Sequence, residues 1–203
     1  MRVSNPYENL YIYYLNALPV ISPDIECLHD FLGTWQEADI AFLFFSSPRD
    51  GLVDQLVNEN DGIDLVDRFE MTGDQWHGDR IEPYVIDDFY ICPPWHPTDQ
   101  ENREHLHILM DPGVVFGTGR HQTTEDCLQL IYRLFSRESS AATIKTVLDI
   151  GTGTGLLALS AAAMGCSRIL ACDFNRLAVK TTLNNIRLNG FERQILAFQA
   201  RGE

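Results

Sequence analysis

The stretch Thr146–Asp173, TVLDIGTGTGLLALSAAAMGCSRILACD, decides the fold of this chain of 203 residues. A short apolar run leads into three glycines, Gly151, Gly153 and Gly155, and a segment rich in Ala and Leu follows them. A second apolar run then ends at Asp173. Short apolar runs bounded by turn residues are typical of buried strands, and the Ala/Leu segment favours a helix. The stretch therefore predicts a strand, a glycine turn, a helix and a second strand that ends on an acid.

The spacing of the glycines narrows the ligand that such a turn would take. Glycines let a ligand approach the backbone closely, and a carboxylate at the tip of the next strand can bind two ribose hydroxyls. The dinucleotide fingerprint places two residues between its second and third glycines, whereas only Thr154 separates Gly153 from Gly155. No Lys-Ser or Lys-Thr pair follows, which excludes a phosphate-binding P-loop. A turn that serves packing alone is the alternative, and the combination with Asp173 favours a nucleoside ligand.

Composition bounds the class of protein. The chain is long enough for one large or two small domains. Its formal net charge of −14 argues against a direct nucleic-acid-binding surface, which needs clustered Lys and Arg. The same charge suits a basic partner, although acidity also simply keeps a protein soluble. The five scattered cysteines form no Cys-x-x-Cys pair, and neither a signal peptide nor a membrane-length apolar run is visible, so we expect a cytoplasmic protein.

Residues 1–70 predict a small α+β unit, which we expect to be ferredoxin-like. Strand-like runs occur at Leu10–Leu15, Asp39–Phe45 and Ile63–Phe69. Ser22 opens a helix whose apolar residues recur at helical spacing as far as Leu32, and Ser47 opens a second helix. No residues in this segment have a catalytic spacing, so packing or substrate recognition is the expected task.

Residues 71–105 predict a linker that contains a hairpin. The segment is aromatic and rich in proline, and Phe89–Cys92 is expected to pair with His105–Met110 across a long loop. Trp76 and Trp95 could form a substrate platform, but large aromatic side chains are mostly buried, and we expect them to fill the seam between two domains.

Two histidines near the end of this region are possible metal ligands. His105 and His107 are separated by one residue, so in a strand both lie on the same face. Such a pair could supply two ligands to a metal ion. No third ligand stands at a suggestive spacing, and we predict a structural or surface role and no bound metal.

A second glycine-rich stretch, Asp111–Thr124, reads DPGVVFGTGRHQTT. Its glycines indicate unusual backbone dihedral angles or close approach of the backbone. Thr123 and Thr124 precede two acids, which predicts a helix N-terminus with a hydroxyl cap. A glycine loop that leads into a helix N-terminus presents free N–H groups and the positive end of the helix dipole. Such a site suits a carboxylate, for example that of a methionine moiety; an ordinary capped helix is the alternative.

The motifs together resemble those of one family, the bacterial methyltransferases of ribosomal protein L11. The turn with single residues between its glycines resembles the first motif of S-adenosylmethionine-dependent methyltransferases. The other matching segments are Phe89–Trp95, Met110–Gly113, Phe116–Gly119, His121, Thr123, Thr124, Cys127, Leu128 and Asp173. The resemblance is specific between Trp76 and Gly190, and the first 70 residues agree only in general layout.

The resemblance implies a fold and an activity. Residues 1–70 would be a ferredoxin-like domain that presents the protein substrate. Residues 106–203 would be the N-terminal half of a doubly wound, Rossmann-like α/β domain that binds S-adenosylmethionine. The implied reaction is methylation of lysine side chains and of the N-terminal amine of a basic ribosomal protein.

The resemblance also implies residue roles. Thr124, Gly151, Gly153 and Asp173 would contact the cofactor: Thr124 near a helix N-terminus, Gly151 through its backbone and Asp173 at the ribose hydroxyls. No catalytic residue is implied, because the family's asparagine-bearing motif has no counterpart in the chain. We therefore expect a member truncated at its C-terminus, whose three parallel strands leave an apolar edge open. Arg120 stands where relatives commonly carry a small or neutral residue.

Other functions stay open beside this one. The chain could be a methyltransferase-like protein that binds cofactor or partner without turnover. It could also be a methyltransferase that acts on a small molecule or another protein. A dinucleotide-dependent oxidoreductase is disfavoured by the spacing of the glycines.

Overall fold

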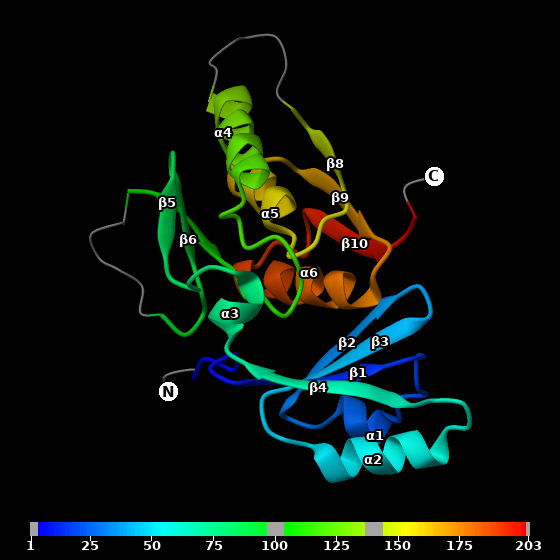
Figure 1. The fold of residues 1–203 in the computed structure, drawn as a ribbon. Coiled ribbons are helices and arrows are strands. Elements are labelled where there is room, and N and C mark those ends of the chain that lie inside the picture. Colours follow the sequence, from blue (N-terminus) through cyan, green and yellow to red (C-terminus); the bar gives the residue numbers. More distant parts are fainter. Residues whose placement is uncertain (1–3, 97–103, 137–143, 202–203) are drawn as a thin grey trace. The chain divides into compact units, whose positions relative to one another are not determined.

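The computed structural model describes residues 4–96, 104–136 and 144–201, which form two compact units (Figure 1). The first unit comprises Ser4–Arg80, and the second begins at Ile81. The boundary therefore falls inside the segment 71–105 that the sequence presented as a linker, and the later part of that segment contributes strands to the second unit.

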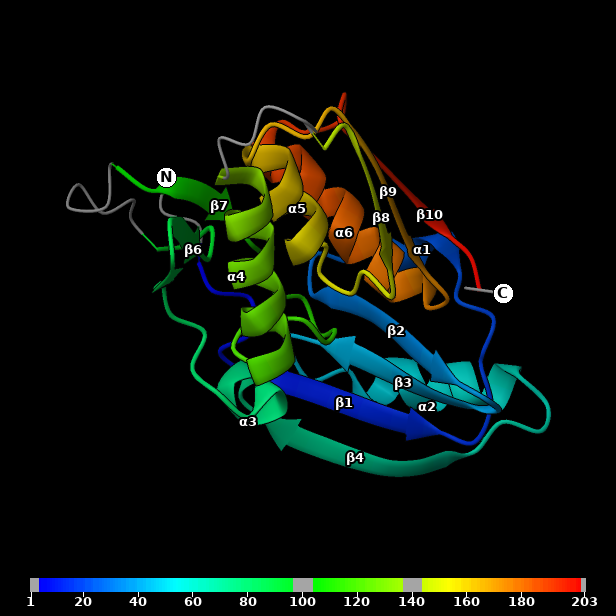
Figure 2. The same cartoon turned by 90° about the horizontal axis from the view of Figure 1, so that it is seen from above.

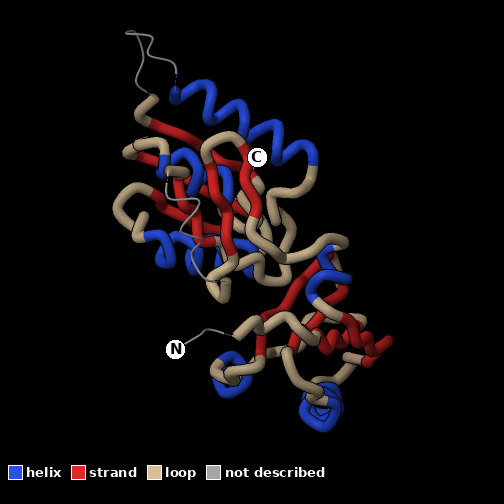
Figure 3. Tube along the Cα trace, turned by 90° about the vertical axis from the view of Figure 1, so that its left-hand side faces the viewer, coloured by secondary structure: helices blue, strands red, loops and turns tan. Residues whose placement is uncertain are grey.

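The N-terminal unit is a four-stranded antiparallel sheet with two helices on one face (Figure 1 and Figure 3). Its elements are β1 (Leu10–Leu15), α1 (Pro23–Glu26), β2 (Phe31–Glu37), β3 (Ile40–Phe45), α2 (Asp50–Glu59) and β4 (Leu65–Met71). The strand order is β2-β3-β1-β4, and all neighbouring strands are antiparallel. This order of elements is the one on which ferredoxin-like units are built, and the assignment to that class stays a prediction.

The first helix is shorter than its sequence pattern indicated. Ser22 caps it as expected, because its hydroxyl accepts a hydrogen bond from the N–H of Ile25 at 3.4 Å. However, α1 is only four residues long, and Phe31 begins strand β2. Phe31 packs on Phe45 with ring centroids 5.1 Å apart. The prediction of a helix as far as Leu32 was wrong because packing in the sheet overrides a local helical spacing.

Helix α3 (Gly73–His77) closes the N-terminal unit. Thr72 and Gln75 form a reciprocal capping box at its start. Trp76 packs edge-on against Phe44 of the same unit, with ring centroids 5.0 Å apart. Trp76 therefore contributes to the packing of its own unit.

The second unit opens with a small three-stranded sheet made of β5 (Tyr84–Ile86), β6 (Phe89–Cys92) and β7 (Leu106–Leu109). Strands β5 and β6 are antiparallel and form a hairpin, whereas β6 and β7 are parallel. The predicted pairing of β6 with β7 is therefore confirmed, but the prediction that they form an antiparallel hairpin was wrong. Parallel strands need a longer crossover connection, and residues 97–103 of that connection lie outside the described chain.

The larger sheet of this unit is parallel and follows the predicted alternation of strands and helices. Its elements are β8 (Thr146–Ile150), α5 (Leu156–Ala163), β9 (Arg168–Asp173), α6 (Arg176–Asn189) and β10 (Ile195–Gln199). The strand order is β10-β9-β8, and α5 and α6 lie on the same side of the sheet (Figure 2). A further helix, α4 (Gln122–Ser136), packs against α5. The predicted Rossmann-like α/β fold is confirmed.

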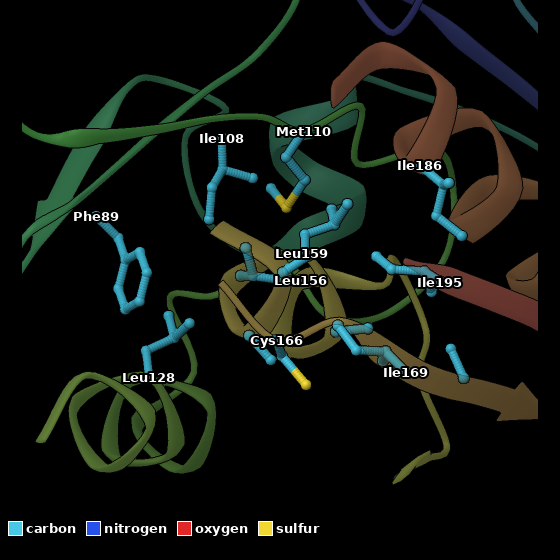
Figure 4. Packing of buried hydrophobic residues seen from close by; sticks show 14 of the residues in the cluster. Phe89, Ile108, Met110, Leu128, Leu156, Leu159, Cys166, Ile169, Ile186 and Ile195 are labelled. Carbon is cyan, nitrogen blue, oxygen red and sulfur yellow. The ribbon is translucent and has the colours of Figure 1, made fainter. Parts of the chain in front are cut away.

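The core of the second unit surrounds α5. Figure 4 shows side chains from β6, β7, α4, α6 and the parallel sheet packed about Leu156 and Leu159 of this helix. Because α5 is covered on several sides, almost all of its residues are buried, and it has no polar face. The glycine turn is therefore attached to the most enclosed helix of the unit.

The opposite face of the parallel sheet is apolar and exposed. Leu148, Leu170 and Leu196 are paired across the three strands, and their exposed fractions are 58%, 44% and 62%. Ile150 and Phe198 are also exposed on this face, whereas Cys172, which pairs with both of them, is buried. Within the described residues, β8 pairs only with β9. None of the helices in the described ranges is long and apolar enough to cross a membrane.

Candidate functional site

The glycine turn connects β8 to α5, and its three glycines differ in what surrounds them. Gly151, Gly153 and Gly155 have φ angles of 73°, 57° and 85°, in the left-handed region that favours glycine. A Cβ atom added to Gly151 would meet nothing within 4 Å, whereas one added to Gly153 would lie 2.5 Å from the carbonyl oxygen of Phe116. The backbone at Gly151 is thus open to a ligand, while Gly153 is required for packing.

Asp173, the last residue of β9, is buried beside the turn. Its Oδ2 accepts a hydrogen bond from the N–H of Gly153 at 3.0 Å, and its Oδ1 accepts one from the N–H of Asn175 at 2.9 Å. A carboxylate oxygen can accept more than one hydrogen bond, so both keep capacity for ligand hydroxyls. The structure therefore brings together two of the residues that the sequence nominated.

A second buried carboxylate, Asp149, lies in β8 just before the turn. Its Oδ2 accepts a hydrogen bond from the hydroxyl of Thr152 at 2.7 Å. Burial raises the pKa of Asp149 above its ordinary value, the Thr152 hydrogen bond opposes this, and the negative charge of Asp173 adds to it. Sequence reasoning did not single out Asp149. The sequence feature that could have indicated Asp149 is that it is the one acid in an apolar strand that leads into a glycine turn.

The second glycine-rich stretch packs directly on the first. The hydroxyl of Thr154 donates to the carbonyl of Gly117 at 2.6 Å, and a Cβ atom at Gly117 would lie 3.1 Å from the same hydroxyl. The Phe116 side chain beside this contact is 76% exposed. The glycine turn and the loop Asp111–Gly119, which the sequence analysis treated separately, are thus in direct contact. The exposed ring of Phe116 lies next to this contact.

Thr124 lies in the first turn of α4 and is partly buried. Its N–H donates to the carbonyl of His121 at 2.9 Å. The expected hydroxyl cap was wrong, because Thr123 is already inside the helix and its backbone N–H lies 3.4 Å from the His121 ring nitrogen Nδ1, which takes the capping place. Within residues 104–136 and 144–201, no hydrogen bond joins Thr124 to Gly151 or Asp173.

Arg120, which replaces the small or neutral residue common in relatives, is held against β5. Its guanidinium carbon lies 4.8 Å from the ring centroid of Tyr84, and its Nη2 donates to the carbonyl of Glu82 at 3.2 Å. The Tyr84 hydroxyl in turn donates to the carbonyl of Thr118. Arg120 therefore supports the loop through β5.

The histidines of the small sheet do not converge. His105 Nδ1 lies 3.4 Å from a carboxylate oxygen of Asp88, and the His107 ring packs against Tyr90 with centroids 5.0 Å apart. In the described parts of the chain, no three His, Cys, Asp or Glu side chains are grouped so that they could hold a metal ion.

The arrangement suits a ligand that combines hydroxyls with positive charge. Asp173 is the last residue of β9, and Asp149 is the last but one of β8, the adjacent parallel strand. Both carboxylates therefore lie at the carboxyl ends of the strands, where ligands of open α/β sheets bind. A Cβ atom added to Gly151 would meet nothing within 4 Å, so the backbone of the turn is open at this residue. A nucleoside with a cationic group meets these features, because the carboxylates attract the charge and Asp173 can accept from ribose hydroxyls.

Comparison with known proteins adds a family match. The family described as "Ribosomal protein L11 methyltransferase (PrmA)" matches residues 48–203. A ribosomal protein L11 methyltransferase from Thermosynechococcus vestitus is 33% identical over 177 residues, which cover 85% of this chain and 54% of the relative. One from Escherichia coli (strain 55989 / EAEC) is 31% identical over 156 residues, which cover 69% and 50%. The chain thus spans about half the length of these curated relatives.

Among solved structures, the ribosomal protein L11 methylase from Lactobacillus delbrueckii subsp. bulgaricus is similar with a TM-score of 0.47. It is 28% identical, and the match covers 58% of this chain and 55% of that chain. The glycine turn, Asp149 and Asp173 all lie inside the range that the family matches. The first 47 residues lie outside it.

Proposed function

The chain belongs to the ribosomal protein L11 methyltransferase (PrmA) family, and we propose that it acts in the S-adenosylmethionine-dependent methylation of amino groups on a ribosomal protein. The observation that carries this proposal is the hydrogen bond of 3.0 Å between Gly153 and Asp173, which joins the glycine turn to the acid at the end of the next strand. The family match includes both residues. A cytoplasmic location follows from the proposed substrate.

The residues of the site fit the proposed cofactor. When bound, S-adenosylmethionine supplies an electrophilic methyl group. Asp173 would accept from the two ribose hydroxyls, and the open backbone at Gly151 would approach the nucleoside. Thr124, in the first turn of α4, would lie near the carboxylate of the methionine moiety. Asp149, which the sequence reasoning missed, would attract the positive charge of the ligand.

The proposed substrate group is an amine that must lose its proton before it can attack. A free lysine amine has a pKa of about 10.4, so a site that removes water around it would favour the neutral form. We assign no general base, and the contribution of the chain is alignment of cofactor and amine.

We assign presentation of the protein substrate to the N-terminal unit. Two features support this role. The unit is compact and separate in its contacts, and its residues 4–80 contain 15 Asp and Glu but only three Arg and no Lys, so its negative charge would attract a basic protein. We expect no direct contact with nucleic acid, because the chain carries few clustered basic residues.

The experiment that tests the proposal is a transfer assay with radiolabelled S-adenosylmethionine and purified ribosomal protein L11. Label that appears on lysine and N-terminal amines of the ribosomal protein would support the proposal. Binding of S-adenosylhomocysteine without any transfer would favour the other candidate, a methyltransferase-like protein that binds without turnover. Transfer to other cellular components but not to the ribosomal protein would point to a different substrate.

A further inference from the structure

A buried amide in α6 joins the two loops of the candidate site. Asn185 is fully buried, and every hydrogen-bonding position that its side chain needs is filled. Its Oδ1 accepts from the backbone N–H of Asp111 at 2.8 Å, and its Nδ2 donates to the carbonyls of Asp111 and Thr154, both at 2.8 Å. One side chain therefore holds the loop that follows β7 and the glycine turn at a fixed separation.

The chemistry of the contact requires an asparagine. The side-chain amide offers two N–H donors and one carbonyl acceptor, and this position uses all three. A carboxylate lacks the donors, a hydroxyl has only one, and glutamine is longer by a methylene group. Loss of the amide would leave buried backbone carbonyls without partners, which is unfavourable.

Neighbouring contacts from α6 strengthen the same connection. The hydroxyl of Thr182, one turn before Asn185, donates to the carbonyl of Gly153 at 2.9 Å. A Cβ atom added to Gly155 would lie 2.9 Å from Thr182 Cγ2, and one added to Gly113 would lie 2.9 Å from Thr181 Oγ1. Both glycine-rich loops thus rest directly on the same face of α6.

We propose that Asn185 is a positioning residue for the cofactor site, because it fixes the glycine turn against the loop Asp111–Gly119 before a ligand arrives. This inference rests on the proposed function, since it assigns the two loops to the binding of S-adenosylmethionine. A site held in its binding geometry by buried hydrogen bonds does not have to be ordered when the ligand binds. Asn185 acts through the backbone of Thr154 and need not touch the ligand.

The same helix supplies a matched control. Asn189 lies one turn after Asn185 and makes the same set of bonds with other partners: its Oδ1 accepts from the N–H of Leu109 at 2.9 Å, and its Nδ2 donates to the carbonyls of Leu109 and Asn185, each at 2.7 Å. It holds the end of β7 but has no bond to the glycine turn. Asn185→Leu and Asn189→Leu therefore delete the same number of side-chain bonds, and leucine keeps the size and branching of the side chain. Asn189 is half-buried, and one of its three bonds lies within α6.

The experiment compares these two variants with the unmodified chain by hydrogen exchange without ligand and by calorimetric titration with S-adenosylhomocysteine. Both variants should unfold at a lower urea concentration than the unmodified chain. Only Asn185→Leu should speed amide exchange in residues 151–156, and it should weaken S-adenosylhomocysteine binding at least about tenfold more than Asn189→Leu, after correction for the folded fraction.

Equal effects of the two variants on exchange in residues 151–156, or on affinity, would overturn the assignment of Asn185. Should Asn185→Leu fail to fold, Asn185→Ser and Asn189→Ser delete part of the same bonds and are compared in the same way. If the unmodified chain does not bind S-adenosylhomocysteine, the proposed function fails. Exchange in the free chain then still decides whether Asn185 holds the turn.

Discussion

At the scale of single residues, two buried carboxylates at adjacent strand ends have different surroundings. Asp173 accepts two backbone N–H groups at 3.0 Å and 2.9 Å. The carboxyl of Asp149 is also buried, and burial raises its pKa despite hydrogen bonds from Thr152 and from the backbone of Ala158. These contacts indicate separate tasks: Asp173 is held in place as an acceptor, whereas Asp149 carries a charge whose burial outweighs the hydrogen bonds that it accepts.

Replacing Asp173 with asparagine tests its role as an acceptor. The change keeps the shape but removes the charge and one acceptor oxygen, so we expect affinity for S-adenosylhomocysteine to fall about tenfold to a hundredfold, as for loss of charge-assisted hydrogen bonds. Calorimetric titration measures the loss. Asp67→Asn, at an exposed acid in β4, is the control. Unchanged affinity in Asp173→Asn would remove Asp173 from the site.

The substitution Asp149→Asn should stabilise the chain at neutral pH while it weakens ligand binding. Because the folded pKa of Asp149 is raised, the unmodified chain loses stability as pH rises from the unfolded value of about 3.9 through the folded value. The Asp149→Asn variant lacks this charge, so its advantage in urea midpoint should be present at pH 7 and vanish at low pH. A midpoint below that of the unmodified chain at pH 7 would contradict this account.

At the scale of elements, the glycine turn separates a ligand-facing position from a packing position. Both Gly151 and Gly153 have positive φ, but only Gly153 would place a Cβ atom against a backbone carbonyl. Thr182 and Asn185 of α6 donate side-chain hydrogen bonds to backbone carbonyls of the turn. The turn is thus bonded to α6 at Gly153 and Thr154, and its backbone is open at Gly151.

Alanine at the two glycines should therefore have unequal effects on folding. Each substitution forces an L-residue into the left-handed region, at a cost of about 1–2 kcal/mol in the free energy of unfolding. Gly153→Ala adds overpacking against Phe116, which typically costs a further ~1–3 kcal/mol. Urea unfolding compares the two variants. Equal destabilisation would show that Gly153 is not a packing position.

The ion pair between Asp30, which is buried, and Arg49, which is partly exposed, makes a second test at this scale. Arg49 donates to both carboxylate oxygens of Asp30 at 2.6 Å and 2.8 Å, and this bonding lowers the pKa of Asp30. The contribution is therefore present above the unfolded pKa of Asp, about 3.9, and is lost as pH falls through the folded value. Arg49→Met should leave Asp30 buried without its partner.

Arg49→Met should lower the free energy of unfolding at pH 7, because the substitution leaves the buried carboxylate of Asp30 without its partner. The deficit should shrink below about pH 4, where Asp30 becomes protonated in the unfolded chain and then in the folded one. Circular dichroism of urea unfolding at pH 7 and pH 3 measures both. The exposed pair formed by Arg68 and Asp54 is the control, and Asp54→Asn should change stability by less than about 1 kcal/mol. A loss in Arg49→Met independent of pH would contradict the role given to Asp30.

At the scale of the whole molecule, the two faces of the parallel sheet differ in burial. Ile169 is 2% exposed and packs in the core, whereas its neighbour Leu170 is 44% exposed on the other face. This difference follows from the alternation of side chains along a strand, combined with helices on one side only. The exposed face is apolar across all three strands, from Leu148 to Leu196.

Threonine at the two neighbouring positions of β9 tests this asymmetry. Ile169→Thr places a hydroxyl in the core and should lower the free energy of unfolding by about 2–3 kcal/mol. Leu170→Thr changes an exposed position and should lower it by less than ~1 kcal/mol. Urea unfolding of both variants provides the comparison. A large loss in Leu170→Thr would show that this face is covered in solution.

What the sequence could predict depended on whether the signal was local. The glycine turn and the helix cap at Ser22 carry local signals, and both appear where the sequence placed them. Strand β2 and the cap at His121 were missed, because packing of Phe31 and the geometry of a loop decide them. The cofactor roles of the nominated residues stay predictions.

Contacts between distant segments could not be derived from spacing. The parallel pairing of β6 with β7 depends on a crossover that no turn motif announces. Asn185 looked like an ordinary helix residue, and only the folded chain shows that it bridges Asp111 and Thr154. The sequence around Asp149 gives only a weak indication of a functional role. Its burial and its hydrogen bond with Thr152, which only the structure shows, make it a candidate residue of the cofactor site.

The central claim is that the glycine turn and Asp173 form a nucleoside site. The most direct measurement is a titration of the isotope-labelled chain with S-adenosylhomocysteine, followed by the backbone amide resonances. We predict saturable shifts centred on Gly151, Gly153 and Asp173. In Asp173→Asn they should reach half-saturation only at about tenfold to hundredfold higher ligand concentration, and NADH should not reproduce them. Shifts that centre elsewhere, or no shifts at millimolar ligand, would contradict the account.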